Sequence, residues 1–77
     1  MMTKNHLELI NILTNDDNYY MVNIRIEIDE IKIQFNILHF EVTIYNTPEY
    51  DLCIEGTGLK TNDVYEVLGY FGGCVVY

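Results

Sequence analysis

The stretch from Tyr19 to Ile44 alternates apolar and polar residues, which is the pattern of β-strands with one buried face. Apolar residues occupy the even positions from Tyr20 to Ile28 and then the odd positions from Ile31 to Ile37. This change of phase predicts two long strands joined by a turn at Asp29 and Glu30.

A hairpin with that turn puts all of its apolar pairs on one face. Glu27 then lies opposite Lys32 on the other face, and a one-residue slip would break every match. The inner side chains, which we expect to be nearly fully buried under helices, form two facing pairs: Ile26 with Ile33, and Ile24 with Phe35.

The phase changes again at Leu38 and His39, where the chain has no Gly, Pro or Asp. We interpret this change as a β-bulge or corner inside one long bent strand that continues to Ile44. A turn at residues 46–49 then leads into a strand over residues 50–55. The matched apolar positions of the two strands place Glu41 directly opposite Glu55 on the outer face.

Two segments have helical spacing of their apolar residues. Residues 3–15 predict a helix with Thr3 as its N-cap, and residues 61–71 predict another, capped by Thr61 or Asn62. Residues 74–77 are short and β-branched, and predict a final strand at a sheet edge. The expected fold is α+β, a single small domain over residues 1–77, with an antiparallel sheet, both helices on one face and the order α-β-β-β-α-β.

The composition and net charge exclude some classes of binding partner. Twelve acidic residues against four basic ones give a net charge of −8, which argues against binding nucleic acid or an anionic membrane. The sequence has no apolar run of membrane-spanning length and no signal-peptide pattern at its start, so we expect a cytoplasmic protein. The two cysteines predict free thiols, with Cys53 pointing outward and made unreactive by its neighbours Asp51 and Glu55.

Candidate chemistry is sparse. Neither His6 nor His39 lies near a Ser or Cys in sequence. We therefore expect that the protein is not an enzyme and binds no cofactor. His39, Glu41 and Glu55 would share a strand face and could hold a divalent metal, although a solvated polar face is the commoner outcome for such a set. The metal alternative stays open at this point.

The chain is very small, acidic, rich in Asn, Ile and Tyr, and lacks a catalytic set. That profile resembles phage-encoded inhibitors of bacterial defence systems, including some anti-CRISPR proteins. The resemblance implies an inhibitor that covers the basic nucleic-acid-binding surface of an enzyme in the host cytoplasm, with tyrosine anchors. The residues that we expect to contact this basic protein partner are Glu41, Glu55, Asp51, Tyr45, Glu27 and Asp29.

The alternative function is structural. An edge strand at residues 74–77, with no charge or proline to protect it, would allow the domain to pair with a second copy as a homodimer.

Overall fold

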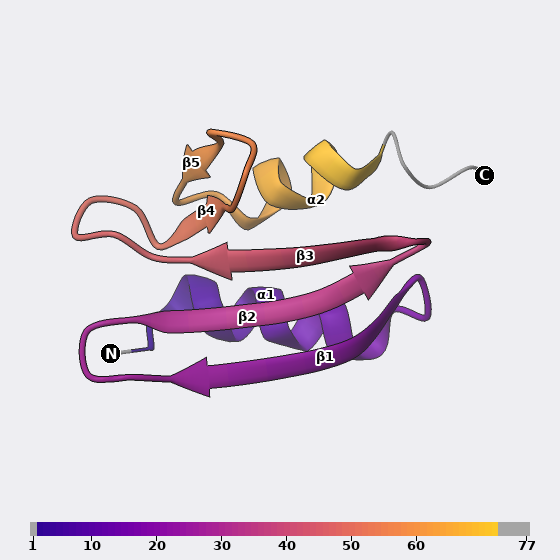
Figure 1. Ribbon diagram of the computed structural model, residues 1–77, viewed down its shortest axis with the longest axis horizontal. Helices are drawn as coiled ribbons and strands as arrows, with labels where there is room; N and C mark the ends of the chain where they lie inside the picture. The colour runs from indigo at the N-terminus through magenta and orange to yellow at the C-terminus, as the bar shows by residue number, and fades with distance from the viewer. Residues whose placement is uncertain (1, 73–77) are drawn as a thin grey trace.

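The computed structural model describes residues 2–72, in which two helices and five strands follow the order α-β-β-β-β-β-α (Figure 1). The strands form one antiparallel sheet in which each strand neighbours the next one along the chain. This arrangement confirms the α+β class. The elements are α1 (Lys4–Asn15), β1 (Tyr19–Ile26), β2 (Ile31–Ile37), β3 (Phe40–Tyr45), β4 (Leu52–Ile54), β5 (Lys60–Thr61) and α2 (Val64–Gly72).

One hydrophobic core joins the helices to the sheet, as expected for two helices on one face. Leu9 and Leu13 of α1 and Phe71 of α2 are buried in the same cluster as the inward residues of β2 and β3. The Phe35 ring stands edge-on to Phe71 and to Tyr19, with ring centroids 5.6 and 5.5 Å apart. No helix in residues 2–72 is long and apolar enough to cross a membrane.

The helix starts follow from local capping. Thr3 caps α1 as predicted, because its side chain accepts a hydrogen bond from the His6 backbone N–H. Asp63, rather than Thr61 or Asn62, caps α2, and its carboxylate accepts the Tyr65 N–H at 2.9 Å. Thr61 belongs to β5 and is buried.

The β1–β2 register differs from the prediction by two residues. Ile26 faces Ile31 and Ile24 faces Ile33, and the turn is closed by a hydrogen bond from the Glu27 N–H to the Glu30 carbonyl at 2.8 Å. A two-residue shift leaves every side chain on its predicted face, so the alternation of the sequence cannot exclude it.

Ile24 and Ile26 were predicted to be buried, and this prediction is wrong. The Ile24 side chain is 38% exposed and Ile26 is 66% exposed, whereas Ile33 and Phe35 are buried as predicted. β1 is an outer strand with a neighbour on one side only, and the β1–β2 turn projects past the start of α1 (Figure 1). From Asn23 to Ile26 the alternation reported the correct face of β1 but not the depth at which that face is covered. The bulge between Tyr20 and Asn23 sets Tyr20 opposite Asn36 on the outer face, so the predicted inward position of Tyr20 is wrong.

A tight turn divides the predicted long bent strand at Leu38 and His39. Ile37 faces Phe40 across this turn, so the chain reverses and β3 pairs antiparallel with β2. Leu38 takes a φ of +54°, which glycine usually provides in a two-residue hairpin turn. The prediction of a bulge failed because a leucine occupies a strained position that the residue types did not reveal.

The β3–β4 register is also displaced by two residues. Ile44 faces Ile54, and the Glu55 N–H donates to the Thr43 carbonyl at 3.0 Å. Glu55 is therefore opposite Thr43, and the predicted direct opposition of Glu41 and Glu55 is wrong. The predicted strand at residues 74–77 lies outside the described residues.

Candidate protein-binding surface

A cleft of about 210 Å³ opens where β3 runs beside the end of α2. β4 is only three residues long, and it pairs with β3 only at Ile44 and Tyr45. The start of β3, beside the cleft, is therefore not covered by β4. The Phe40 and Tyr70 rings border the cleft and are 56% and 49% exposed. Phe71 lies beneath them, buried and edge-on to Tyr70 with ring centroids 5.2 Å apart.

Two carboxylates complete this cleft. Glu41 and Glu55 both line it, and both are exposed. They reach it from different strands, because Glu41 is the second residue of β3 and Glu55 directly follows β4. The structure therefore brings two of the predicted site residues together around an apolar hollow, although they are not directly opposite each other.

Tyr45 lies on the face of the sheet that the helices leave open. It faces Cys53 on β4 and is half-buried, and with Glu55 it borders a second hollow of about 210 Å³. A hollow of about 320 Å³ lies on the same face, and its lining includes side-chain amides, a methionine and Glu41: Asn23, Gln34, Asn36, Met21 and Glu41. The open face thus carries charged groups of both signs and neutral amides, and it is not a uniform acidic surface.

Asp51 does not belong to this surface, because its carboxylate is engaged within the fold. Its Oδ2 accepts hydrogen bonds from Thr3 Oγ1 at 3.0 Å and from Asn5 Nδ2 at 2.9 Å. Its carbonyl accepts from His6 Nε2 at 2.9 Å, and its N–H donates to Asn62 Oδ1 at 2.7 Å. Asp51 therefore joins the start of α1 to the β3–β4 loop, a structural role.

His6 completes the same junction. Its ring is buried, and its Nδ1 accepts the Thr3 backbone N–H at 2.9 Å. With Nδ1 accepting and Nε2 donating to Asp51, the ring is the neutral tautomer protonated at Nε2. This histidine holds the helix start in place.

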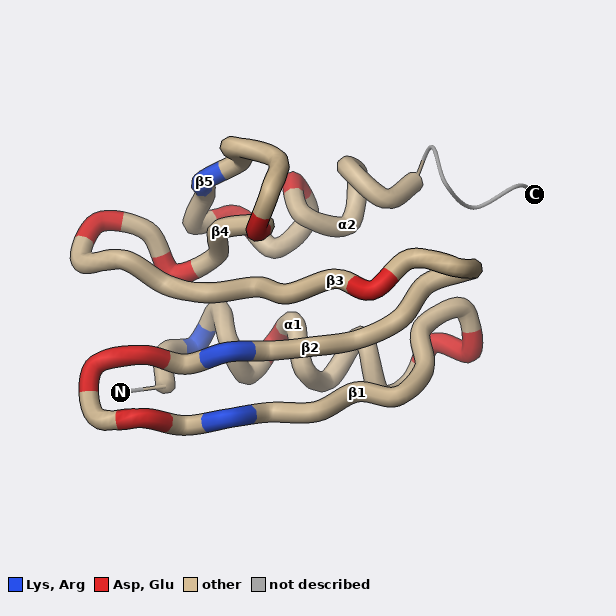
Figure 2. Tube along the Cα trace, in the orientation of Figure 1, with Lys and Arg blue, Asp and Glu red and all other residues tan. Residues whose placement is uncertain are grey.

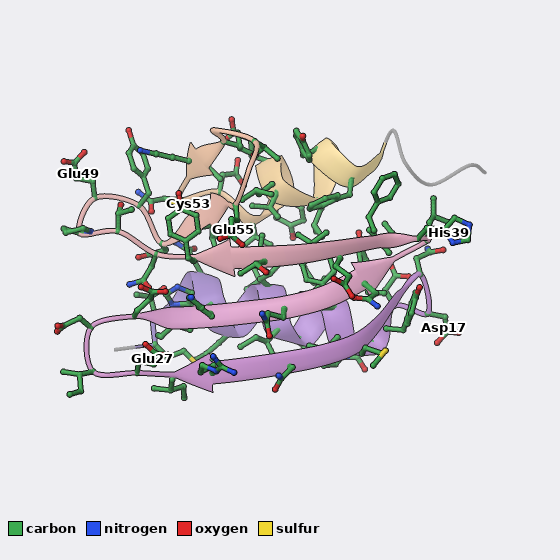
Figure 3. All side chains as sticks on the ribbon, viewed as in Figure 1. Asp17, Glu27, His39, Glu49, Cys53 and Glu55 are labelled. Carbon is green, nitrogen blue, oxygen red and sulfur yellow. The ribbon has the colours of Figure 1, made fainter. Side chains whose placement is uncertain are left out.

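Glu27 and Asp29 lie in or beside the β1–β2 turn, at the end of the sheet opposite to His39 (Figure 3). They are exposed, but they do not meet Glu41 and Glu55. Figure 2 shows acidic positions at both ends of the sheet, whereas Arg25 and Lys32 lie side by side on β1 and β2.

His39 lies in the β2–β3 turn, far from Glu55 in the view of Figure 3. In the described residues, no three His, Cys, Asp or Glu side chains gather closely enough to hold a metal ion. His39, Glu41 and Glu55 therefore do not form the metal site that their sequence positions allowed.

Cys53 was predicted to point outward, but its side chain is fully buried. Burial raises the pKa of the Cys53 thiol, while a hydrogen bond with Thr47 and the nearby Lys60 charge oppose the rise. The pKa of the Cys53 thiol is therefore raised, as the prediction of an unreactive thiol requires, but the main cause is burial and not the acidic neighbours.

Sequence reasoning missed the apolar part of the surface. Phe40 falls within the predicted long bent strand, and its exposure follows from the turn that precedes it. Met21 and Leu38 are also exposed, and both have positive φ values (53° and 54°). The Tyr20 hydroxyl donates to the Leu38 carbonyl and so connects the bulge of β1 to the β2–β3 turn.

Comparisons with protein families, curated proteins and solved structures gave no match to this chain.

Proposed function

We propose that the chain is a non-catalytic protein-binding domain, an inhibitor that covers the basic nucleic-acid-binding surface of an enzyme. The observation that carries this proposal is the cleft beside β3 and α2, where the rings of Phe40 and Tyr70 meet the carboxylates of Glu41 and Glu55. An arginine or lysine side chain suits such a cleft, because its stem packs on the rings while its charge meets the carboxylates.

Charge supports the same partner class. The net charge of −8 attracts basic proteins over long range and accelerates their association at low salt. Proteins that bind phosphate backbones carry clustered Lys and Arg, which are the groups that the cleft would accept. An acidic domain that occupies those groups acts as a nucleic-acid mimic, and this is the mode of action that an anti-CRISPR-like, phage-encoded inhibitor in the bacterial cytoplasm would use.

A fluorescent arginine-rich peptide provides a direct test by anisotropy at low salt. We expect Glu41→Gln with Glu55→Gln to weaken peptide binding by about tenfold, because two charge-assisted contacts are lost. Phe40→Ala should weaken it as well, without unfolding the domain, because the ring is more than half exposed.

The matched control removes the same charge elsewhere. Asp17→Asn with Glu49→Gln neutralises two exposed carboxylates that do not line the cleft. If this control weakens peptide binding as much as the cleft variant does, binding depends only on net charge and the cleft is not the site.

The inhibitory role needs the natural partner. The parent chain, the cleft variant and the control variant would serve as matched baits in cell lysate, with captured proteins read by quantitative mass spectrometry. The proposal requires a nucleic-acid-binding enzyme that the parent and control retain and the cleft variant loses. The purified chain must also block that enzyme's binding to DNA or RNA, and unimpaired nucleic-acid binding would overturn the inhibitor function.

A further inference from the structure

β1 is an outer strand of the sheet, and its backbone phase shows which of its groups face the open edge. The Glu27 N–H bonds to the Glu30 carbonyl, and Arg25 pairs with Lys32 two residues along. Backbone groups alternate along an antiparallel strand, so the N–H and C=O groups of Ile24 and Ile26 point away from β2. These groups are a template for another strand.

The side chains at the same positions are apolar and uncovered. Ile24 and Ile26 share a face with the buried Ile33 and Ile31, yet they are 38% and 66% exposed. The apolar layer therefore continues past the core to the open edge. A strand added at this edge would cover it.

The charges on the other face of β1 are unfavourably placed within one chain. Arg25 faces Lys32, and Glu27 faces Glu30 across the turn. Like charges in opposite positions are destabilising. In the described residues the only ion pair joins Lys32 Nζ to Glu30 Oε1 at 3.4 Å, which leaves Arg25 and Glu27 without an opposite charge.

We propose that a second copy of this chain pairs antiparallel along β1, about a two-fold axis at Ile26. Ile26 faces Ile26 of the partner subunit, and their outward backbone groups bond to each other. Arg25 then faces Glu27 of the partner subunit, and Glu27 faces Arg25 of the partner subunit. Both charges gain an opposite partner at positions where facing side chains lie closest, so one register satisfies the backbone, the apolar layer and the charges.

The next two registers toward the start of β1 lack this match. If the second strand is shifted by one residue, backbone groups that point toward it lie opposite groups that point away. The alternative registers therefore differ by two residues. Moving the axis to Arg25 places two arginines face to face. Moving it to Ile24 pairs Arg25 with Asn23 of the partner subunit, and sets Glu27 against the bulged Met21, where the extended strand is interrupted.

Charge exchange tests both the surface and the register by sedimentation velocity over a range of protein concentrations at low salt. We expect the parent chain to dimerise, and Ile26→Lys to be monomeric because it places two lysines at the axis. Arg25→Glu and Glu27→Arg should each weaken dimerisation by about tenfold, because each places like charges in two facing pairs. The double variant Arg25→Glu/Glu27→Arg should restore the parent dimer, because the facing pairs are opposite again.

Circular dichroism controls for folding, and all of these positions are exposed. Hydrogen exchange gives a second readout, since the amides of Ile24 and Ile26 should become protected as the dimer forms. A parent chain that stays monomeric at all concentrations overturns the proposal. A dimer that tolerates Ile26→Lys uses another surface, and a double variant that fails to recover excludes this register.

Discussion

Strands β1 and β2 carry similar patterns but have different environments. Both place isoleucine at alternate positions, yet Ile33 of β2 is fully buried while Ile26 of β1 is 66% exposed. β2 has a strand on each side, whereas β1 has one neighbour and an open edge. Alternation therefore identifies the apolar face of a strand, while the position of the strand in the sheet decides how much of that face is removed from water.

Matched truncations should separate the two strands most clearly. We expect Ile33→Ala to lower the free energy of unfolding by about 2–5 kcal/mol, because it leaves a cavity in the core. Ile26→Ala should change it by about 0.5 kcal/mol or less in dilute monomeric protein, because the side chain is already largely in water. Urea denaturation measures both, and equal losses would show that the two strands are equally covered.

The same contrast exists between two carboxylates of the β3–β4 loop. Asp51→Ala removes the acceptor for Thr3 and Asn5, and we expect a loss of about 1–3 kcal/mol. Glu49→Ala removes an exposed side chain and should be nearly neutral. Thermal unfolding of the two variants makes the comparison, and a neutral Asp51→Ala would contradict the structural role of this carboxylate.

A smaller effect is expected at Met21, where the bulge changes the register of β1. Glycine adopts the Met21 φ of +53° without steric strain, so Met21→Gly should be neutral or slightly stabilising despite the entropy that glycine loses on folding. Met21→Val should be less stable than Met21→Gly by about 1 kcal/mol, because β-branched residues tolerate this conformation poorly. Denaturation midpoints would test the order, and the reverse order would show that the bulge relaxes when the side chain changes.

The sequence predicts the helices, the cap at Thr3 and, except at the β1 bulge that turns Tyr20 outward, the faces of the strands, because these features depend on short-range patterns. It does not predict register, because moving a partner strand by two residues keeps every face unchanged. The β1–β2 register is set by the turn at Ile28–Asp29, and the β3–β4 register is set by the turn after Tyr45. Neither turn contains the glycine that would have marked a tight turn. In the second case the structure uses Asp51 to bind α1, which draws the loop away from the predicted pairing.

The candidate site was predicted only in part for the same reason. Glu41 and Glu55 do line the same cleft, because the two-residue shift of the β3–β4 register leaves both of them beside it. Phe40 and Tyr70 were not assigned to the site, since their exposure depends on a strained turn at Leu38 and on the short length of β4. Neither feature has a signature in residue type.

The order of the sheet also has a consequence for the route by which the chain folds. Each strand pairs with its neighbour in sequence, so only short loops must close to form the sheet. The bond between Thr3 and Asp51 spans 48 residues, and it completes the attachment of α1. Pairings between strands that are neighbours in sequence close short loops, so we expect the sheet to form quickly and the Thr3–Asp51 contact to form later.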